Sequence, residues 1–279
     1  MICSIDELLE DSISRLSQSD VTFELKPRYE SEILLSFLLG VPRTYLHTHS
    51  AQNIESTLAQ RFYTLINERA KGKPIEYITR QASFYERSFY VDERVLIPRP
   101  ETEILIDKAN EIIKGEKVNF IAEVGVGSGI ITTTLAIMHP QCYFFATDIS
   151  EQALEVSKLN IATYAPNANI TLQCCSLLPA HINPQLIISN PPYIKDDYPI
   201  SAPLHYEPKI ALFGGKDGLG ILKSLINECA TRKVWLLCEI GYDQKDALEH
   251  ILLQSRAKNI TFYKDLSGWD RGFSAYFGI

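Results

Sequence analysis

The sequence predicts a small all-α domain, a β-hairpin linker and an α/β domain with a mostly parallel sheet. Apolar residues recur at helical spacing from Ile5 to about Ala70, whereas strand-like and helical segments alternate in the C-terminal two thirds of the chain. Such alternation is typical of βαβ units, whose strands lie parallel in one sheet. We therefore expect the helical domain at 1–72, the linker at 73–98 and the α/β domain at 99–279.

Three helical segments make up the predicted all-α domain. They read "DELLEDSISRL", "ESEILLSFLLG" and "NIESTLAQRFYTLINERAKG", and the last two close at Gly40 and Gly72. Beyond Pro74 the pattern changes to short aromatic and alternating runs, "ASFYERSFYVDERVLIPRP". A period of two indicates strands, so this stretch predicts a β-hairpin.

The α/β domain is predicted from helical and strand-like segments that take turns. The helical ones read "ETEILIDKANEII", "GIITTTLAIM" and "SEQALEVSKLNIA", and the strand-like ones read "VNFIAEVG", "CYFFATD", "NITLQCC" and "QLIIS". Alternation of this kind predicts βαβ units and a parallel sheet.

Composition describes an ordinary globular protein of 279 residues, 46% hydrophobic and 22% charged, long enough for two domains. A net charge of −7 argues against a protein that mainly wraps duplex nucleic acid, because such proteins have a basic footprint. The start, "MICSIDELLEDSISRL", lacks the basic flank and apolar core of a secretory signal, and no apolar run reaches bilayer length. We therefore expect a cytoplasmic protein with no membrane partner.

The cysteines agree with that compartment. They show no C-x-x-C spacing, and most lie within apolar strand-like runs. We expect buried free thiols rather than disulfides or a metal site, as is usual where the surroundings are reducing. The six residues are Cys3, Cys142, Cys174, Cys175, Cys229 and Cys238.

A glycine-rich stretch, "EVGVGSGI" at 123–130, is the first candidate binding motif. Gly125, Gly127 and Gly129 follow a strand and open a helix, so the backbone can turn tightly and approach a ligand closely. A dinucleotide fingerprint would need a further glycine where Ile130 stands. The motif therefore predicts a ligand loop of another kind, with a plain structural turn as the alternative.

An acid follows about twenty residues later, in "YFFATDIS". Asp148 ends the next strand, where a carboxylate can accept hydrogen bonds from both hydroxyl groups of a ribose. The alternative role, the N-cap of the following helix, is better filled by Ser150. Together the glycine-rich loop and the acid predict a cofactor that contains a nucleoside.

The stretch "LIISNPPYIKDD" at 186–197 ends another buried strand. Pro191 lacks a backbone N–H, so the strand must stop there. This places Asn-Pro-Pro-Tyr (residues 190–193) at the carboxyl end of a strand, which is where open α/β sheets bind ligands. Many strands end in an Asn-Pro turn without any such role, so the motif by itself leaves both interpretations open.

With these motifs the sequence resembles the class I S-adenosylmethionine-dependent methyltransferases that methylate amide or amine nitrogens. From about Pro27 to the C-terminus it is similar to the peptide chain release factor glutamine N5-methyltransferases, most clearly in "PIEYITRQASFYERSFYVDERVLIPRPETE", "YEPKIALFGGKDGLGILKSLI" and "DLSGWDRGFSAYF". The resemblance implies a Rossmann-like domain with a mostly parallel seven-stranded sheet and S-adenosyl-L-methionine as cofactor. It also implies methylation of the glutamine in the Gly-Gly-Gln motif of release factors.

The resemblance also assigns the cofactor site. Residues 125–129 would hold the amino acid end of the cofactor, and Asp148 would hold its ribose. Glu123 stands where the family usually has Asp, and Ser176 stands where it usually has an acid beside the adenine. The implied cofactor-binding residues are Gly125, Val126, Gly127, Ser128, Gly129, Asp148, Leu177, which would pack on the adenine, and Asn190.

The catalytic residues implied are Asn190, Pro191, Pro192 and Tyr193. A carboxamide nitrogen is a poor nucleophile and a sulfonium methyl is a strong electrophile, so catalysis consists mostly of placement. The Asn190 side-chain oxygen and the Pro191 carbonyl can accept from the two amide N–H groups. The prolines stiffen the loop, and Tyr193 can stack on the amide.

Other polar residues near the predicted sheet edge have two interpretations. In "IPRPETE", Pro100 fits the first position of a helix, while Arg99 and Glu101 could instead lie near the charged end of the cofactor. For Glu239, at the end of "VWLLCEIG", we favour a carboxylate that orders a loop, and Arg271 could anchor a terminal hairpin.

Three functions stay open at this point. Protein glutamine methylation, with release factors as partners, is favoured; a ribosomal protein glutamine is a variant of it. Methylation of adenine N6 would need a basic or aromatic recognition region, and the helical domain has mixed charge, so we expect no stable nucleic-acid partner. A module that binds the cofactor without chemistry is disfavoured by the intact Asn-Pro-Pro-Tyr. We expect a monomer whose helical domain selects the protein substrate.

Overall fold

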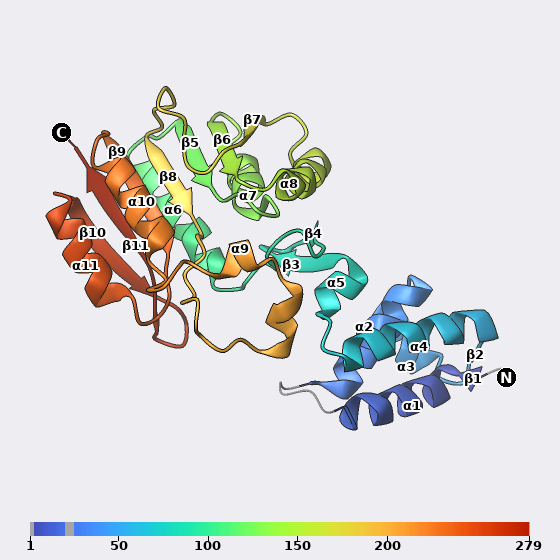
Figure 1. Cartoon of the computed structure of the whole chain (residues 1–279). Coiled ribbons are helices and arrows are strands. Elements are labelled where there is room, and N and C mark those ends of the chain that lie inside the picture. The colour runs from blue at the N-terminus through green and yellow to red at the C-terminus, as the bar shows by residue number, and fades with distance from the viewer. Residues whose placement is uncertain (1–2, 20–24, 279) are drawn as a thin grey trace. The chain divides into compact units, whose positions relative to one another are not determined.

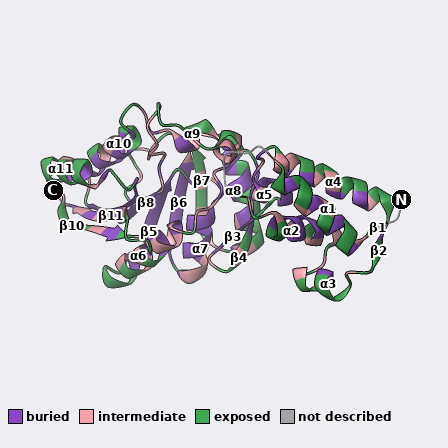
Figure 2. Cartoon of the chain, turned by 90° about the horizontal axis from the view of Figure 1, so that it is seen from below, coloured by how far each residue is buried: buried purple, intermediate pink, exposed green. Residues whose placement is uncertain are grey.

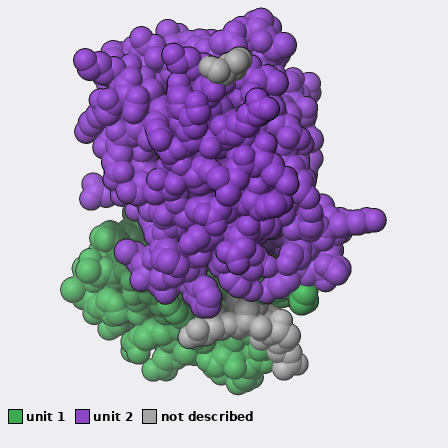
Figure 3. Space-filling model, turned by 90° about the vertical axis from the view of Figure 1, so that its left-hand side faces the viewer, with its two compact units in different colours: residues 1–81, 199–206 green, residues 82–198, 207–279 purple. Residues whose placement is uncertain are grey.

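The computed structural model describes residues 3–19 and 25–278 of the chain. Its elements, coloured along the chain in Figure 1, divide into two compact units. One unit comprises residues 1–81 and 199–206, and the other comprises residues 82–198 and 207–279 (Figure 3). None of the described helices is both long and apolar enough to span a bilayer.

The first unit is helical, as predicted. Its helices are α1 (Ile5–Ser17), α2 (Pro27–Leu39), α3 (Arg43–Thr48), α4 (Ser56–Ala70) and α5 (Ile75–Thr79), and a 3-10 helix spans Ala202–Tyr206. Two short strands, β1 (Cys3–Ser4) and β2 (Asn53–Ile54), pair antiparallel.

Local signals define where these helices begin and end. Ser4 and Glu7 form a capping box at the start of α1, and α2 begins at Pro27 and ends at Gly40 in the left-handed conformation. The apolar faces of α1, α2 and α4 meet in one core that includes Leu8, Leu35, Phe62 and Ile66. Burial of these side chains holds the helices together, since isolated helices of this length are marginal in water.

The second unit contains a seven-stranded sheet, which confirms the predicted fold class. Its strands are β5 (Phe120–Val124), β6 (Tyr143–Asp148), β7 (Asn169–Cys174), β8 (Leu186–Ser189), β9 (Val234–Glu239), β10 (Lys258–Lys264) and β11 (Asp270–Phe277). Their order is β10-β11-β9-β8-β5-β6-β7. Strands β5 to β9 pair in parallel, and β11 lies antiparallel between β9 and β10.

Helices and a hairpin complete this unit. The helices are α6 (Thr102–Gly115), α7 (Ile130–Met138), α8 (Glu151–Tyr164), α9 (Lys209–Leu212), α10 (Gly220–Cys229) and α11 (Lys245–Gln254). The hairpin strands are β3 (Gln81–Phe84), of which the first residue belongs to the other unit, and β4 (Arg87–Tyr90). Phe84 and Phe89 of the hairpin pack into the same apolar cluster as Leu105 of α6, so the hairpin is bound to the α/β core.

Alternate strand residues supply the two faces of the sheet. Ile121 and Ile188 pack with α6 and α7 on one face, while Ala122 and Ile187 pack with α10 and α11 on the other. The central strands β5, β6 and β8 are therefore largely buried (Figure 2). Beyond β5 the chain extends the sheet first through β6 and β7, and then on the opposite side through β8 and β9. The carboxyl ends of β5 and β8 thus flank the topological switch point, where open α/β sheets bind ligands.

The cysteines are all free, as predicted, but only half of them are buried. Cys142, Cys229 and Cys238 lie in the core, whereas Cys174 is exposed and Cys3 and Cys175 are half-buried. The expectation of buried thiols is therefore confirmed for three cysteines and wrong for the other three. Cys174 is the last residue of β7, an edge strand in which every residue is exposed or half-buried.

Candidate active site

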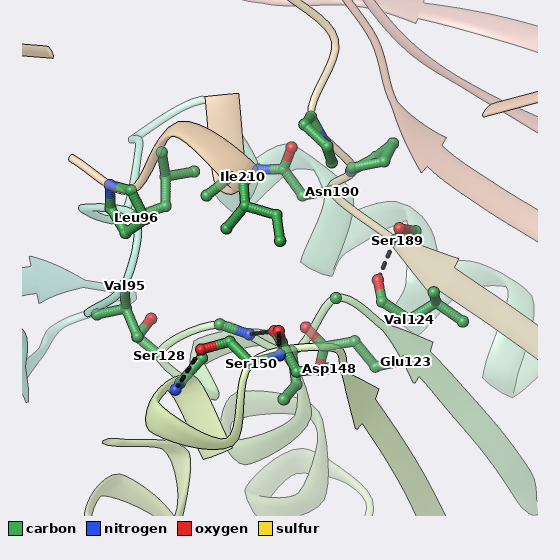
Figure 4. A pocket seen from close by; sticks show the side chains of 18 of the residues that line it. Val95, Leu96, Glu123, Val124, Ser128, Asp148, Ser150, Ser189, Asn190 and Ile210 are labelled. Atoms are coloured by element: carbon green, nitrogen blue, oxygen red, sulfur yellow. Dashed lines mark hydrogen bonds between the residues drawn. The ribbon is translucent and has the colours of Figure 1, made fainter. Parts of the chain in front are cut away.

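A cavity lies at the carboxyl ends of β5, β6 and β8, entirely within the α/β unit (Figure 4). Its walls bring together most of the residues that the sequence singled out. These are Gly125, Val126, Gly127, Ser128, Asp148, Asn190, Pro191 and Pro192. Gly129, Leu177 and Tyr193 do not line it.

The glycine loop, residues 125–129, connects β5 to α7. Gly125, Gly127 and Gly129 all have positive φ, at 78°, 51° and 81°, which residues with a side chain rarely adopt. A Cβ on Gly125 or Gly127 would meet no atom within 4 Å, so their backbone faces open space. A Cβ on Gly129 would lie 3.1 Å from the Cα of Ser157 on α8. The first two glycines thus leave room for a ligand, and the third allows close helix packing.

Asp148 is held against the glycine loop. Its Oδ2 accepts a hydrogen bond from Gly127 N at 2.9 Å, and its Oδ1 accepts one from Ser150 N at 2.9 Å. Ser150 caps α8 by accepting from Ala153 N at 3.1 Å, which confirms the predicted N-cap. A carboxylate has about four acceptor sites, so Asp148 keeps lone pairs for a ligand in the cavity.

Glu123 is a buried carboxylate in the cavity wall, with 2% of its surface exposed. Its Oε2 accepts from the Thr132 amide at 2.8 Å and from the Thr132 hydroxyl. Its Oε1 has no hydrogen-bond partner among the described residues. Burial raises the pKa of Glu123 to about 8, and the nearby charge of Asp148 adds to the effect. Such an oxygen is costly to leave unpaired, so the site fits a ligand that brings a cationic donor.

The part of the cavity beyond Asp148 differs from the expectation. Leu177 packs against the apolar cluster on the α10 face of the sheet instead of lining the cavity, whereas Ser176 does line it. Ile149, which is 52% exposed, also lines the cavity directly after Asp148. Sequence reasoning missed Ile149, although an apolar residue immediately after the strand-ending acid was the available signal. It offers a flat ligand an apolar surface that Leu177 does not.

The Asn-Pro-Pro-Tyr loop, residues 190–193, leaves two acceptors open. Asn190 Nδ2 donates to Thr102 Oγ1 at 3.2 Å. Within the described ranges, neither Asn190 Oδ1 nor the Pro191 carbonyl accepts a hydrogen bond. Tyr193 does not line the cavity, and its hydroxyl donates to Glu239 Oε1 at 3.2 Å. Burial and the charge of Glu239 raise the pKa of Tyr193, which keeps that hydroxyl protonated.

The loop of residues 213–220 packs its backbone against the Asn-Pro-Pro-Tyr loop. Gly214 N donates to Ile194 O at 2.8 Å, and Gln244 Nε2 donates to Tyr193 O at 3.0 Å. A Cβ on Gly214 would clash with the carbonyl oxygen of Pro192, and the same holds for Gly218 and Tyr193. The glycines in "FGGKDGLG" thus allow two backbones to touch, and this contact fixes the loop.

Only some residues of the segment "IPRPETE" line the cavity. Arg99 lines the cavity and pairs with Glu207 at 2.6 Å, and Glu207 also accepts from Ile97 N at 3.0 Å. Glu101 directly precedes α6 and does not line the cavity. The expectation that Pro100 is the first helical residue was wrong, because a turn precedes the helix, which begins at Thr102.

Glu239 and Arg271 also have defined partners. Glu239 accepts from Thr102 Oγ1 at 2.7 Å as well as from Tyr193, so it does order a loop. Arg271 pairs with Asp265 at 2.8 Å within the terminal hairpin β10–β11, as predicted. Glu207 and Thr102 were not identified from the sequence, because their partners lie more than a hundred residues away.

Solved structures with the same fold define the class. The catalytic domain of hMettl16, solved with MAT2A 3′UTR hairpin 6, superposes with a TM-score of 0.56 at 16% identity, covering 82% of this chain and 86% of that one. The ribosomal protein L11 methylase from Lactobacillus delbrueckii subsp. bulgaricus gives 0.50 at 21% identity, covering 68% and 84%. At these identities the likeness concerns the fold alone. The fold, with the glycine loop at its switch point, is that of a class I methyltransferase.

Closer relatives identify the family within that class. Residues 7–79 match the PrmC N-terminal domain, and residues 101–201 match the Methyltransferase small domain. The release factor glutamine methyltransferase of Coxiella burnetii is 33% identical over 269 residues, which cover 94% of this chain and 96% of that one. That of Koribacter versatilis is 34% identical over 259 residues, covering 89% and 90%. The protein belongs to the release factor glutamine methyltransferase family.

Proposed function

We propose that the protein transfers a methyl group from S-adenosyl-L-methionine to the side-chain amide nitrogen, N5, of the glutamine in the Gly-Gly-Gln motif of peptide chain release factors. The observation behind this proposal is the pair of open acceptors at the carboxyl end of β8, Asn190 Oδ1 and the Pro191 carbonyl. A primary amide has two N–H donors on one nitrogen, and two acceptors on one loop match that pattern. The names of the relatives, which are 33% and 34% identical, support a glutamine of a release factor as the substrate.

The residues of the cavity fit the proposed cofactor. The unpartnered Glu123 Oε1 and the open backbone of Gly125 and Gly127 would hold its amino acid end, and Asp148 would accept from its ribose hydroxyls. When bound, S-adenosylmethionine supplies an electrophilic methyl group on a sulfonium sulfur. Ile149 would pack against the adenine.

The chain contributes placement and acceptors to the reaction. Asn190 Oδ1 and the Pro191 carbonyl would accept from the two N–H groups of the glutamine amide, which aims the nitrogen lone pair and raises its electron density. Pro191 and Pro192 bring no N–H that could compete for these acceptors. No side chain needs to remove a proton first, because the nitrogen becomes acidic only as the new C–N bond forms. Water then takes the proton.

We assign substrate selection to the helical unit, since a single glutamine side chain offers too little surface to distinguish one protein from another. Tyr29 and Phe37 on α2 are exposed aromatic residues of that unit, at 49% and 41%. Replacing both by Ala should raise KM for an intact release factor and leave the rate on a short Gly-Gly-Gln peptide unchanged. Leu253→Ala, an exposed apolar residue of the other unit, is the control. Equal effects on factor and peptide would exclude this surface.

The function itself is tested by where the methyl group goes. We propose that the protein acts as a monomer in the cytoplasm. In the test, the purified protein should transfer labelled methyl groups from S-adenosylmethionine to a purified release factor, in a mixture that also contains total cellular nucleic acid. A factor whose Gly-Gly-Gln glutamine is replaced by Ala should stay unlabelled. Label in the nucleic acid would instead favour the adenine N6 alternative, and label in a ribosomal protein would change the protein substrate.

A further inference from the structure

We propose that Thr102 and Glu239 are positioning residues that determine which end of the Asn190 carboxamide faces the substrate. The inference rests on the proposed function and concerns the same site. Its basis is a continuous chain of hydrogen bonds in which Asn190 Nδ2 donates to Thr102 Oγ1 at 3.2 Å and Thr102 Oγ1 donates to Glu239 Oε2 at 2.7 Å.

The direction of these bonds follows from the chemistry of the groups. An ionised carboxylate only accepts hydrogen bonds, so the Thr102 hydroxyl must give its single proton to Glu239. What Thr102 then presents to Asn190 is a lone pair, which only the amide NH₂ can satisfy. The Asn190 oxygen is thereby left without a hydrogen bond among the described residues, and it can serve as the acceptor that the substrate amide needs. Rotated by half a turn, the same side chain would present N–H groups to the N–H groups of the substrate.

The surroundings make this arrangement specific. Thr102 and Glu239 are each 1% exposed, so water does not compete for their hydrogen bonds. They come from different elements, the start of α6 and the end of β9, and Asn190 follows β8 beside them. The second oxygen of Glu239 accepts from Tyr193 at 3.2 Å. One carboxylate therefore orients both ends of the Asn-Pro-Pro-Tyr loop.

The protonation state of Glu239 should affect this chain of hydrogen bonds. Burial raises its pKa to about 7, against the lowering effect of its bonds to Thr102 and Tyr193. The other charged or titratable groups that act on it are Arg271, Glu101 and Tyr263, and Asp265 pairs with Arg271. A protonated Glu239 can donate to Thr102, whose hydroxyl is then free to donate to Asn190 and stabilise the reversed amide. Because the ionised form is the orienting one, turnover should fall as the pH drops below about 7.

The matched variants Thr102→Val and Thr102→Ser test the inference. Valine keeps the shape and removes the hydroxyl, and serine keeps the hydroxyl. For a Gly-Gly-Gln peptide we expect Thr102→Val to lower kcat about tenfold or more, with KM and the cofactor Kd from calorimetry little changed. Thr102→Ser should stay within about threefold of the parent, and the fall in kcat below pH 7 should persist in it and disappear in Thr102→Val.

Two results would overturn the positioning role. One is an equal loss in Thr102→Val and Thr102→Ser, and the other is a loss of cofactor affinity as large as the loss in kcat; both indicate packing alone. If Thr102→Val is unfolded, Thr102→Cys, whose thiol bonds weakly, must still be slower than Thr102→Ser. Absence of glutamine methylation by the parent protein would contradict the proposed function, whereas an active parent with an equally active Thr102→Val contradicts only this inference.

Discussion

Two buried glutamates at the same sheet edge have opposite hydrogen-bonding states. Glu123 lies in β5 just before the glycine loop, and its Oε1 has no partner among the residues that the structure describes. Glu239 uses both oxygens, one for Thr102 and one for Tyr193. Burial raises the pKa of both, to about 8 and about 7. The difference indicates different tasks. A buried carboxylate with an open oxygen is prepared to bind a cation, and one with both oxygens engaged is prepared to orient other side chains.

The site therefore has two regions, and a different measured quantity reports on each of them. Changes around Glu123 and Asp148 should alter the affinity for the cofactor, and changes around Glu239 and Asn190 should alter turnover. Variants that move both quantities together would contradict the division.

The largest effect is expected from Asn190→Ala. This change deletes one of two acceptors that aim the substrate nitrogen, so kcat should fall by about a hundredfold or more. The cofactor Kd, from calorimetry, should change much less than kcat, because we propose that the deleted acceptor bonds to the substrate amide, although Asn190 also lines the cofactor cavity. Near-normal turnover would mean that the Asn-Pro-Pro-Tyr loop is only a turn.

Asp148→Ala should act on the other region. Ribose hydroxyls would lose a charged acceptor worth roughly 1.5 to 3 kcal/mol, which is about a tenfold to hundredfold loss of affinity. Asp148 also orders Gly127 N and Ser150 N, which adds to the loss. Glu151→Ala, an exposed acid in the first turn of α8, serves as control. Unchanged affinity in calorimetry would remove Asp148 from the site.

A smaller effect is expected from Gly214→Ala. The new Cβ would clash with the Pro192 carbonyl and displace the Asn-Pro-Pro-Tyr loop by a few tenths of an ångström or more. We expect kcat to fall by about tenfold with the cofactor Kd unchanged. Gly115→Ala, where a Cβ meets no atom within 4 Å, is the matched control. Equal kinetics in the two variants would show that the contact does not position the loop.

The smallest expected effect is the release of a proton from Glu123 when the cofactor binds. With its pKa near 8, Glu123 is largely protonated at pH 7 in the free protein, and a cationic donor bound to Oε1 lowers that pKa. Cofactor binding at pH 7 should therefore release up to about one proton, and the release should vanish as the pH rises above about 8. Calorimetry in buffers of different ionisation enthalpy measures it. If the Glu123→Gln variant released the same number of protons on cofactor binding, the released proton would come from a group other than Glu123.

Local motifs were predictable from the sequence, and contacts between distant segments were not. The glycine loop and residues 190–193 each follow a strand directly and Asp148 ends one, so the strand pattern placed them at one edge. The links from Thr102 to Glu239 and from Arg99 to Glu207 span 137 and 108 residues, and no local pattern encodes them. Leu177 was expected in the cavity because the family resemblance implies a large residue there, but its side chain packs into the apolar core instead.

The most direct test of the account is tandem mass spectrometry of a release factor after incubation with the purified protein and S-adenosylmethionine. The account predicts one added methyl group on the side-chain nitrogen of the Gly-Gly-Gln glutamine, present with the parent protein and strongly reduced with Asn190→Ala. A methyl group on any other residue, or an equal yield from Asn190→Ala, would contradict it.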